Sequence, residues 1–166
     1  MSTTADYRIE SLKQIITGLD NSIKSLFARA KERGWYDGGW ALEESEPIYG
    51  LALIAFQNYI NGSIKDIAGT SVNKPKFYQI GQPIEGYQKT HIELIICLAN
   101  YIKHVEDDDP FHGPITKVLT HFQLRTDKTC DIDDSPIFKG FELLDENSNL
   151  VEIMKNVKDW RENLWK

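Results

Sequence analysis

Three groups of acidic side chains in this sequence are spaced so that each could present negative charge to a partner. The groups are Glu43, Glu44 and Glu46; Glu106, Asp107, Asp108 and Asp109; and Asp131, Asp133 and Asp134. Gathered carboxylates attract a basic surface and speed its association. Each group also has a structural interpretation, because acids favour a helix N-terminus and charge runs are commonly solvated. We take all three as candidate partner contacts.

The four histidines offer catalytic or metal chemistry, but their spacing completes no known pattern. No His-Glu-x-x-His or Cys/His ligand spacing is present. The acidic run at 106–109 lacks the spaced ligands and central glycine of a calcium-binding loop. One metal set is conceivable at a helix end: His104, Asp107, Asp109 and His112. Without a phosphate-binding loop or a nucleophile–base pair, we assign no catalytic residue, metal or cofactor and expect a protein that is not an enzyme.

Three aromatic residues occur in a glycine-rich stretch that we expect to be a loop over residues 35–46. They are Trp35, Tyr36 and Trp40. Tryptophan and tyrosine are enriched where protein interfaces gain most of their binding energy, so these residues are candidate apolar anchors. The alternative is that they fold back and cover the core.

Charge and composition narrow the class of partner. The 166 residues carry a net charge of −6, from 25 acidic against 19 basic side chains. A general nucleic-acid binder needs clustered positive charge, and so does a protein of anionic membrane surfaces. A hydrophobic content of 41% with 27% charged residues is ordinary for a globular chain. We therefore expect one domain over 1–166 that binds a protein, with no direct nucleic-acid or membrane contact.

Cysteine usage and apolar runs predict a cytoplasmic location. Cys97 lies in an apolar run and Cys130 in a polar stretch, and two such cysteines form no disulfide framework. The start of the sequence is polar, without the apolar region of a signal peptide. The apolar run at 48–60 is broken by Gly50, Gln57 and Asn58, which makes it too polar to span a bilayer.

Helical periodicity predicts an all-α fold, a compact bundle of five or six helices. Apolar residues recur at three- and four-residue steps over 5–33, 45–68, 87–105, 115–122 and 149–165, and a shorter helix begins at Pro136. Gly18 is a weak point of the first helix. Ser45 is the expected N-cap of the second, with Pro47 in its first turn, and Asp134 or Ser135 caps the short one. Residues 70–86 form an expected loop with an extended piece at 74–78.

Two segments carry a resemblance to a known class of proteins. Leu98-Ala-Asn-Tyr-Ile-Lys-His104 and Glu46-Pro-Ile-Tyr-Gly50 resemble small helical bacterial proteins of polymorphic toxin systems, in particular immunity proteins of contact-dependent growth inhibition. The similarity covers residues 46–122, about half of the chain. It implies a cytoplasmic protein that binds the C-terminal domain of a cognate toxin, often a nuclease, and covers its active site.

The same stretch is similar to helical ribonucleases of the HEPN class, which carry an arginine, a polar residue and a later histidine on one helix. Asn100 and His104 match the last two, but position 99 is Ala99 and no arginine precedes it nearby. This departure argues against ribonuclease activity. The sequence thus predicts an immunity protein that neutralises a basic toxin, with a HEPN-like ribonuclease or RNA-binding defence protein as the second reading and a structural adaptor as the third.

Overall fold

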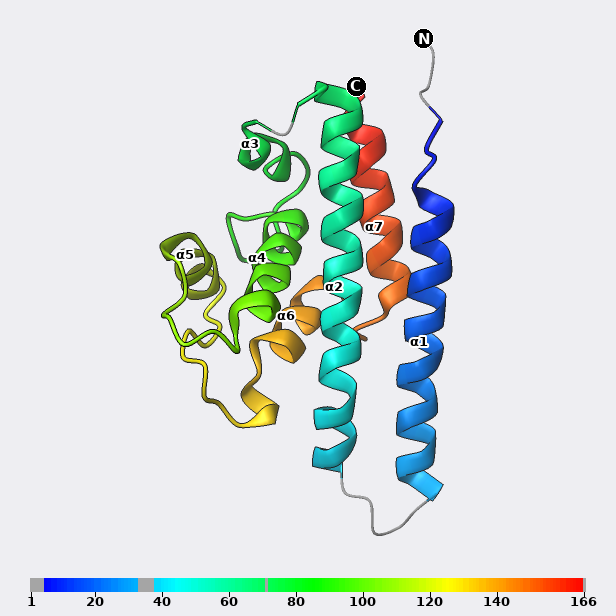
Figure 1. Cartoon of the computed structure of the whole chain (residues 1–166), viewed down its shortest axis with the longest axis vertical. Coiled ribbons are helices and arrows are strands. Elements are labelled where there is room, and N and C mark those ends of the chain that lie inside the picture. Colours follow the sequence, from blue (N-terminus) through cyan, green and yellow to red (C-terminus); the bar gives the residue numbers. More distant parts are fainter. Residues whose placement is uncertain (1–4, 33–37, 71, 166) are drawn as a thin grey trace.

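The chain folds into α-helices joined by loops. The computed structural model describes residues 5–32, 38–70 and 72–165 (Figure 1). These ranges contain seven α-helices and one 3-10 turn, and no strand. They are α1 (Ile9–Glu32), α2 (Gly38–Ala68), α3 (Lys74–Tyr78), α4 (His91–His104), α5 (Gly113–His121), η1 (Ile132–Asp134), α6 (Pro136–Leu144) and α7 (Leu150–Asn163). The all-α fold is confirmed: six helices match those expected, and α3 is an addition.

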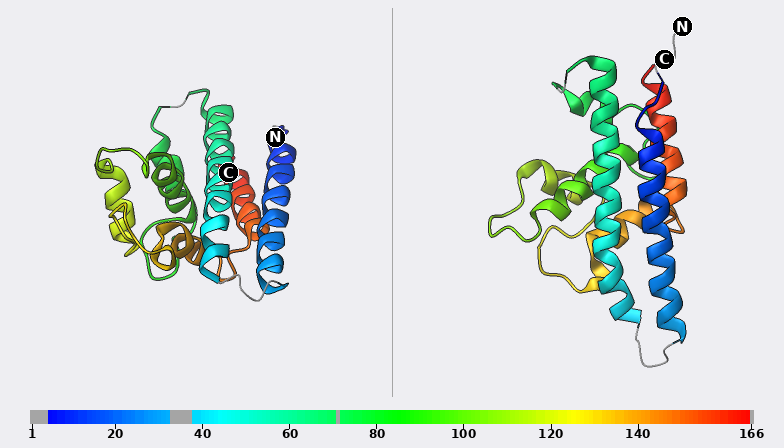
Figure 2. Two further views of the ribbon diagram at one scale, coloured as in Figure 1. Left: turned by 60° about the horizontal axis from the view of Figure 1, so that its bottom comes forward. Right: turned by 45° about the vertical axis from the view of Figure 1, so that its right-hand side comes forward.

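The long helices α1 and α2 run antiparallel, and α2 lies at the centre of the molecule (Figure 1). The helix α7 packs on both of them, while α4 and α6 pack on the other side of α2 and α5 packs on α4 (Figure 2). The helix α1 is amphipathic and buries one stripe, Leu12, Ile16, Ile23 and Leu26. Gly18 lies on its exposed side, and α1 continues through this expected weak point as one helix.

The helix α4 is the most enclosed element. Leu94, Ile95, Leu98 and Ala99 are fully buried, because α2, α5 and α6 pack around it. Its start is fixed by a capping box, in which the Thr90 hydroxyl accepts from the Glu93 N–H and Glu93 accepts from the Thr90 N–H. Each such leucine or isoleucine contributes about 1.5–3 kcal/mol on burial. In the described ranges, no helix combines the length and the apolar character needed to cross a membrane.

The start of α2 corrects the sequence-based expectation. The helix begins at Gly38, so Trp40, Glu43, Glu44 and Glu46 are helical and the expected loop over 35–46 is wrong for these residues. Pro47 lies inside the helix rather than in its first turn. Ser45 is not an N-cap: it is fully buried, and its hydroxyl donates to the Leu42 carbonyl at 3.0 Å. That bond occupies a carbonyl near the proline, which lacks an N–H to donate.

One further local expectation differs from the structure, and an alternative left open by the sequence is decided by it. Residues 74–78 form the short helix α3, not an extended piece, because Pro75 fits the first turn of a helix. Of the two expected caps of α6, Ser135 is the one used: its hydroxyl accepts from the Ile137 N–H at 3.1 Å. Asp134 instead ends the turn η1.

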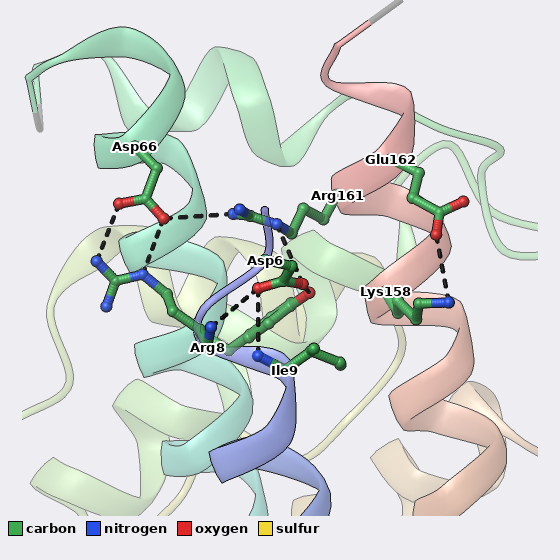
Figure 3. Close-up of polar contacts among 8 residues, drawn as sticks. Asp6, Arg8, Ile9, Asp66, Lys158, Arg161 and Glu162 are labelled. Atoms are coloured by element: carbon green, nitrogen blue, oxygen red, sulfur yellow. Dashed lines mark hydrogen bonds and ion pairs between the residues drawn. The ribbon is translucent and has the colours of Figure 1, made fainter. Parts of the chain in front are cut away.

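An ion network around one buried arginine joins the start of α1 to α2 and α7 (Figure 3). Arg161 of α7 is 3% exposed and contacts Asp6 at 3.2 Å and Asp66 at 3.5 Å. Arg8 donates to both oxygens of Asp66, at 2.9 and 3.0 Å, and this bidentate bond is the main reason that the pKa of Asp66 is lowered. The phenol of Tyr59 also donates to Asp6. The network thus gives the buried guanidinium its compensating carboxylates.

Two glycine substitutions test the packing of α4 against α6. A Cβ at Gly140 would meet Leu98 Cδ1 at 2.4 Å, whereas a Cβ at Gly18 meets nothing within 4 Å. We expect Gly140→Ala to lower the free energy of unfolding by about 1–3 kcal/mol through overpacking. Gly18→Ala is the matched control and should raise it by up to about 1 kcal/mol through helix propensity. Urea denaturation followed by circular dichroism measures both, and equal effects would contradict this packing.

Candidate functional site

Acidic residues that are far apart in the sequence meet at one groove of about 260 Å³. Glu43 and Glu46 reach it from α2, and Glu106 reaches it from the end of α4. Ile132 and Ser135, from the segment around η1, form another wall. We name this feature the acidic groove. Two of the three expected acidic groups therefore contribute to a single site.

The carboxylates of α2 face different sides of the helix. Glu43 is exposed at the rim of the acidic groove. Glu46 is half-buried and accepts a hydrogen bond from the Ser135 hydroxyl, which also caps α6. Glu44 lines a shallow hollow shared with α1, together with Arg29, and does not reach the groove. Glu43 is thus the α2 carboxylate best placed to meet a partner, while Glu46 ties α2 to α6.

The acidic run after α4 is held by a lysine from a distant loop. The Lys128 ammonium donates to the His104 carbonyl at 2.8 Å and to the Asp107 carbonyl, and lies 4.9 Å from the ring centroid of Phe111. This cation offsets the negative end of the α4 dipole. The four acids alone would add to the unfavourable negative charge there. Lys128 also lines the acidic groove.

Within that run, Asp107 has a local partner. Its carboxylate lies 2.7 Å from His104 Nδ1, and this hydrogen bond is the main cause that lowers the pKa of Asp107. Glu106, Asp108 and Asp109 are exposed. Asp107 therefore shapes the loop, and the remaining three carboxylates stay at the surface.

The third acidic group lies beside the groove rather than in it. Asp131 accepts the Asp134 N–H at 2.9 Å through its carbonyl and so begins η1. Asp134 lies 3.7 Å from Arg125, whose closer bond to Asp127 lowers the pKa of Asp127 to about 2. Asp133 lines a different hollow, with Leu42 and Phe138. Only neighbouring side chains of this segment enter the groove.

Burial and negative charge set the protonation of the groove's inner groups. Burial raises the pKa of the Tyr101 phenol, and the carboxylates of Glu46 and Glu106 raise it further. Burial is also the main cause that raises the pKa of the Cys130 thiol, with Glu46 among the charges that add to it. Both groups are therefore neutral at pH 7, and Cys130 is no thiolate nucleophile. Cys97 and Cys130 are free thiols, as the sequence suggested.

The aromatic anchors are only partly placed. Trp35 and Tyr36 lie outside the described residues. Trp40 is on the first turn of α2 and is 55% exposed, so it covers little of the core. It is not part of the wall of the acidic groove.

The histidines do not assemble a metal site in the part of the chain that is described. No group of three or more His, Cys, Asp or Glu side chains there could hold a metal ion. The rings of His104 and His112 make an edge contact with centroids 5.7 Å apart. His121 accepts the Gln88 N–H at 3.2 Å, and burial lowers the pKa of His91. The proposed set of His104, Asp107, Asp109 and His112 thus does not converge as metal ligands.

Sequence reasoning missed the residues that connect the acidic segments. Lys128 and Ser135 bridge parts of the chain that are 24 and 89 residues apart. Ser135 could be found only as a cap, because a serine before a proline is a helix-start signal. Nothing in the pattern around Lys128 marks it as the partner of a helix C-terminus.

Comparisons with known proteins found no match to this chain among protein-family models, curated proteins or solved structures.

The two expected caps of α6 can be separated by substitution. Ser135→Ala removes both the cap and the bond to Glu46, so we expect the free energy of unfolding to fall by about 1–2 kcal/mol. Asp134→Ala removes only an exposed contact of 3.7 Å to Arg125 and should cost less than about 0.5 kcal/mol. Urea denaturation of both variants at pH 7 measures the difference. A larger loss for Asp134→Ala would show that the assigned cap is wrong.

Proposed function

We propose that this protein is an immunity-type inhibitor that binds a cognate toxin domain, a basic nuclease, and covers its active site with the acidic groove. The observation that carries the proposal is the meeting of Glu43 and Glu46 of α2 with Glu106, which follows the C-terminus of α4, at one groove. A protein with this role acts in the cytoplasm, beside the nucleic acids that it protects.

The charge at the groove is suited to a phosphate-binding surface. A nuclease active site is positive because it must hold phosphate, and carboxylates presented there replace the charge of the substrate. Glu43 and Glu106 are exposed at the groove, and Asp108 and Asp109 extend the negative surface along the same loop. Lys128 and Ser135 hold these segments in place, so little ordering is needed on binding.

The carboxylates that are already bonded within the protein are poor probes of binding, and the exposed carboxylates are better ones. Glu46, Asp107 and Asp134 already have protein partners, namely Ser135, His104 and Arg125. Their substitution would confuse lost folding with lost binding. Exposed carboxylates at the groove or beside it are the better probes, and Glu43, Glu106 and Asp108 fit this description.

Charge reversal at the acidic groove should weaken binding to a cognate toxin domain, for which a protein encoded by an adjacent gene is the first to test. The variant carries Glu43→Lys, Glu106→Lys and Asp108→Lys together. We expect the dissociation constant to rise at least about 10-fold, mainly through slower association. Raising the salt concentration should slow association of the unaltered protein as well, because exposed charges are screened within about 10 Å at 0.1 M. Surface plasmon resonance at several salt concentrations measures both effects.

The matched control reverses three exposed carboxylates that lie away from the groove: Glu85→Lys, Glu146→Lys and Asp159→Lys. It changes the net charge equally, so it reports long-range steering alone. We expect a change below about 3-fold in the association rate. Equal losses in the two variants would assign binding to net charge and not to the groove. No binding by the unaltered protein to that toxin domain would end the proposal.

A second candidate, an RNA-cleaving enzyme of the HEPN type, is favoured by one observation. His104 is oriented by Asp107 at 2.7 Å and touches the ring of His112, which is an arrangement that could move protons. The neighbouring carboxylates Glu106, Asp108 and Asp109 oppose it, because they repel the phosphates of RNA.

An RNA-cleavage assay separates the two candidates. We expect the purified protein to leave a labelled single-stranded RNA intact in the presence of EDTA, and His104→Ala to be folded and equally inactive. Cleavage that is lost in both His104→Ala and His112→Ala, while circular dichroism shows the fold retained, would favour the enzyme instead.

A further inference from the structure

A second cavity, of about 820 Å³, has the opposite charge to the acidic groove. It lies between α2, α3, α4 and α5, and three lysines line it, Lys74, Lys89 and Lys117, against one acid, Glu93. Lys89 is paired with Glu93 at 2.8 Å. The uncompensated charge is therefore positive, in a protein whose net charge is −6. We name it the lysine pocket; its volume is in the range of small-molecule sites.

A relay of hydrogen bonds fixes one donor in the wall of this pocket. The Lys103 ammonium can only donate, and it donates to Gln57 Oε1. The Gln57 amide nitrogen then donates to Asn100 Oδ1 at 2.9 Å. The oxygen of Asn100 is thereby satisfied, and its NH₂ group makes no hydrogen bond to a described side chain. In the described part of the chain, Ser63 Oγ is the only fully buried side-chain nitrogen or oxygen atom without a hydrogen-bond partner. The unpartnered Asn100 nitrogen is not in that class, so it keeps some contact with solvent.

A second hydrogen bond fixes the orientation of another amide in the pocket wall, that of Asn61. The Tyr78 phenol donates to Asn61 Oδ1 at 2.8 Å, and burial raises the pKa of Tyr78 to about 12, so the phenol stays protonated. The short helix that carries Tyr78 is held by Trp160, whose indole N–H donates to the Phe77 carbonyl at 3.1 Å. The pocket wall is thus built before any ligand arrives.

Part of the remaining lining is apolar and unreactive. Ile96, Ile115 and Val118 line the same cavity. Cys97 also lines it, and burial raises the pKa of its thiol to about 12. At pH 7 this thiol is neutral and serves as a small apolar group. The cavity therefore combines cations and amide donors with an apolar surface.

We propose that the lysine pocket binds a small organic anion. Its carboxylate or phosphate group is held by Lys74, Lys117 and the Asn100 NH₂ group, and its body contacts Ile96 and Val118. Cations and amide donors together select a negative group, since charge-assisted hydrogen bonds are the stronger ones. This site shares no lining residue with the acidic groove, so it does not rest on the proposed function.

The test uses probes of known chemistry on the whole chain. We would titrate AMP and 2-naphthoate as the two kinds of organic anion, adenosine and 2-naphthalenemethanol as their uncharged counterparts, and inorganic phosphate. Isothermal calorimetry gives the affinity, and NMR of the Asn100 and Asn61 side-chain amides gives the place. We expect AMP or 2-naphthoate to bind at least about 10-fold more tightly than its uncharged counterpart, and to shift the Asn100 signals. Binding of AMP would identify a phosphate as the recognised group, and binding of 2-naphthoate would identify a carboxylate.

Two double variants distinguish binding by the lysines of the pocket from a general effect of positive surface charge. Lys74→Gln with Lys117→Gln should weaken that binding at least about 10-fold, whereas Lys139→Gln with Lys158→Gln, on exposed faces of α6 and α7, should leave it unchanged. Circular dichroism confirms that both variants fold. Failure of both anions to bind, equal binding of the uncharged counterparts or of inorganic phosphate, or equal effects of the two double variants would each overturn the proposal.

Discussion

The apolar run of α4 from Leu94 to Ala99 is the constraint on which the rest of the structure depends. A helix with Leu94, Ile95, Leu98 and Ala99 fully buried needs neighbours in every direction, and α2, α5 and α6 supply them. Both candidate sites are consequences of this enclosure. The acidic groove lies at the C-terminal end of α4, where Tyr101 and Glu106 face the segment around η1. The lysine pocket lies along the side of α4 that carries Glu93, Ile96 and Asn100.

The acidic groove carries negative charge and the lysine pocket carries positive charge. The carboxylates near the acidic groove are not equivalent, because several of them hold the structure together. Glu46 receives the Ser135 hydroxyl, and Asp107 pairs with His104. What remains for a partner is a smaller set at the surface. The lysines have a similar division, since Lys128 and Lys103 satisfy internal acceptors while Lys74 and Lys117 face a cavity.

Periodicity was sufficient to predict six of the seven helices in the described ranges, because each of the six has an apolar stripe or an apolar run, whereas α3 is five residues long and buries none of them. Local signals failed where tertiary contacts outweighed them. Ser45 before Pro47 is a good start signal, yet the chain is already helical there, because Ala41 and Ser45 are buried in the core of the molecule. At α6 the two adjacent candidates, Asp134 and Ser135, could not be ranked from sequence, and geometry selects the serine.

The candidate sites were less accessible to sequence reasoning than the fold. The acidic groups could be identified by composition, but their meeting depends on contacts between residues as far apart as Glu46 and Ser135. Nothing in the sequence indicated the lysine pocket, because its polar lining residues, such as Gln57, Asn100 and Lys117, come from separate segments of the chain and form no spaced motif. Only the spatial arrangement shows that the amide oxygens of Asn100 and Asn61 accept hydrogen bonds from Gln57 and Tyr78.

The buried guanidinium of Arg161 has a consequence for the order in which the chain assembles. The helices α1 and α2 are neighbours in sequence and can pair through a short loop closure, whereas Arg161 is 95 residues from Asp66. Until α7 docks, Asp6 and Asp66 lack one of their cations, and the guanidinium stays in water. Docking must then bury the charge and form its ion pairs in the same event, since burial of an unpaired guanidinium is strongly unfavourable. We therefore expect α7 to add late and all at once, with the Arg161 contacts marking completion of the fold.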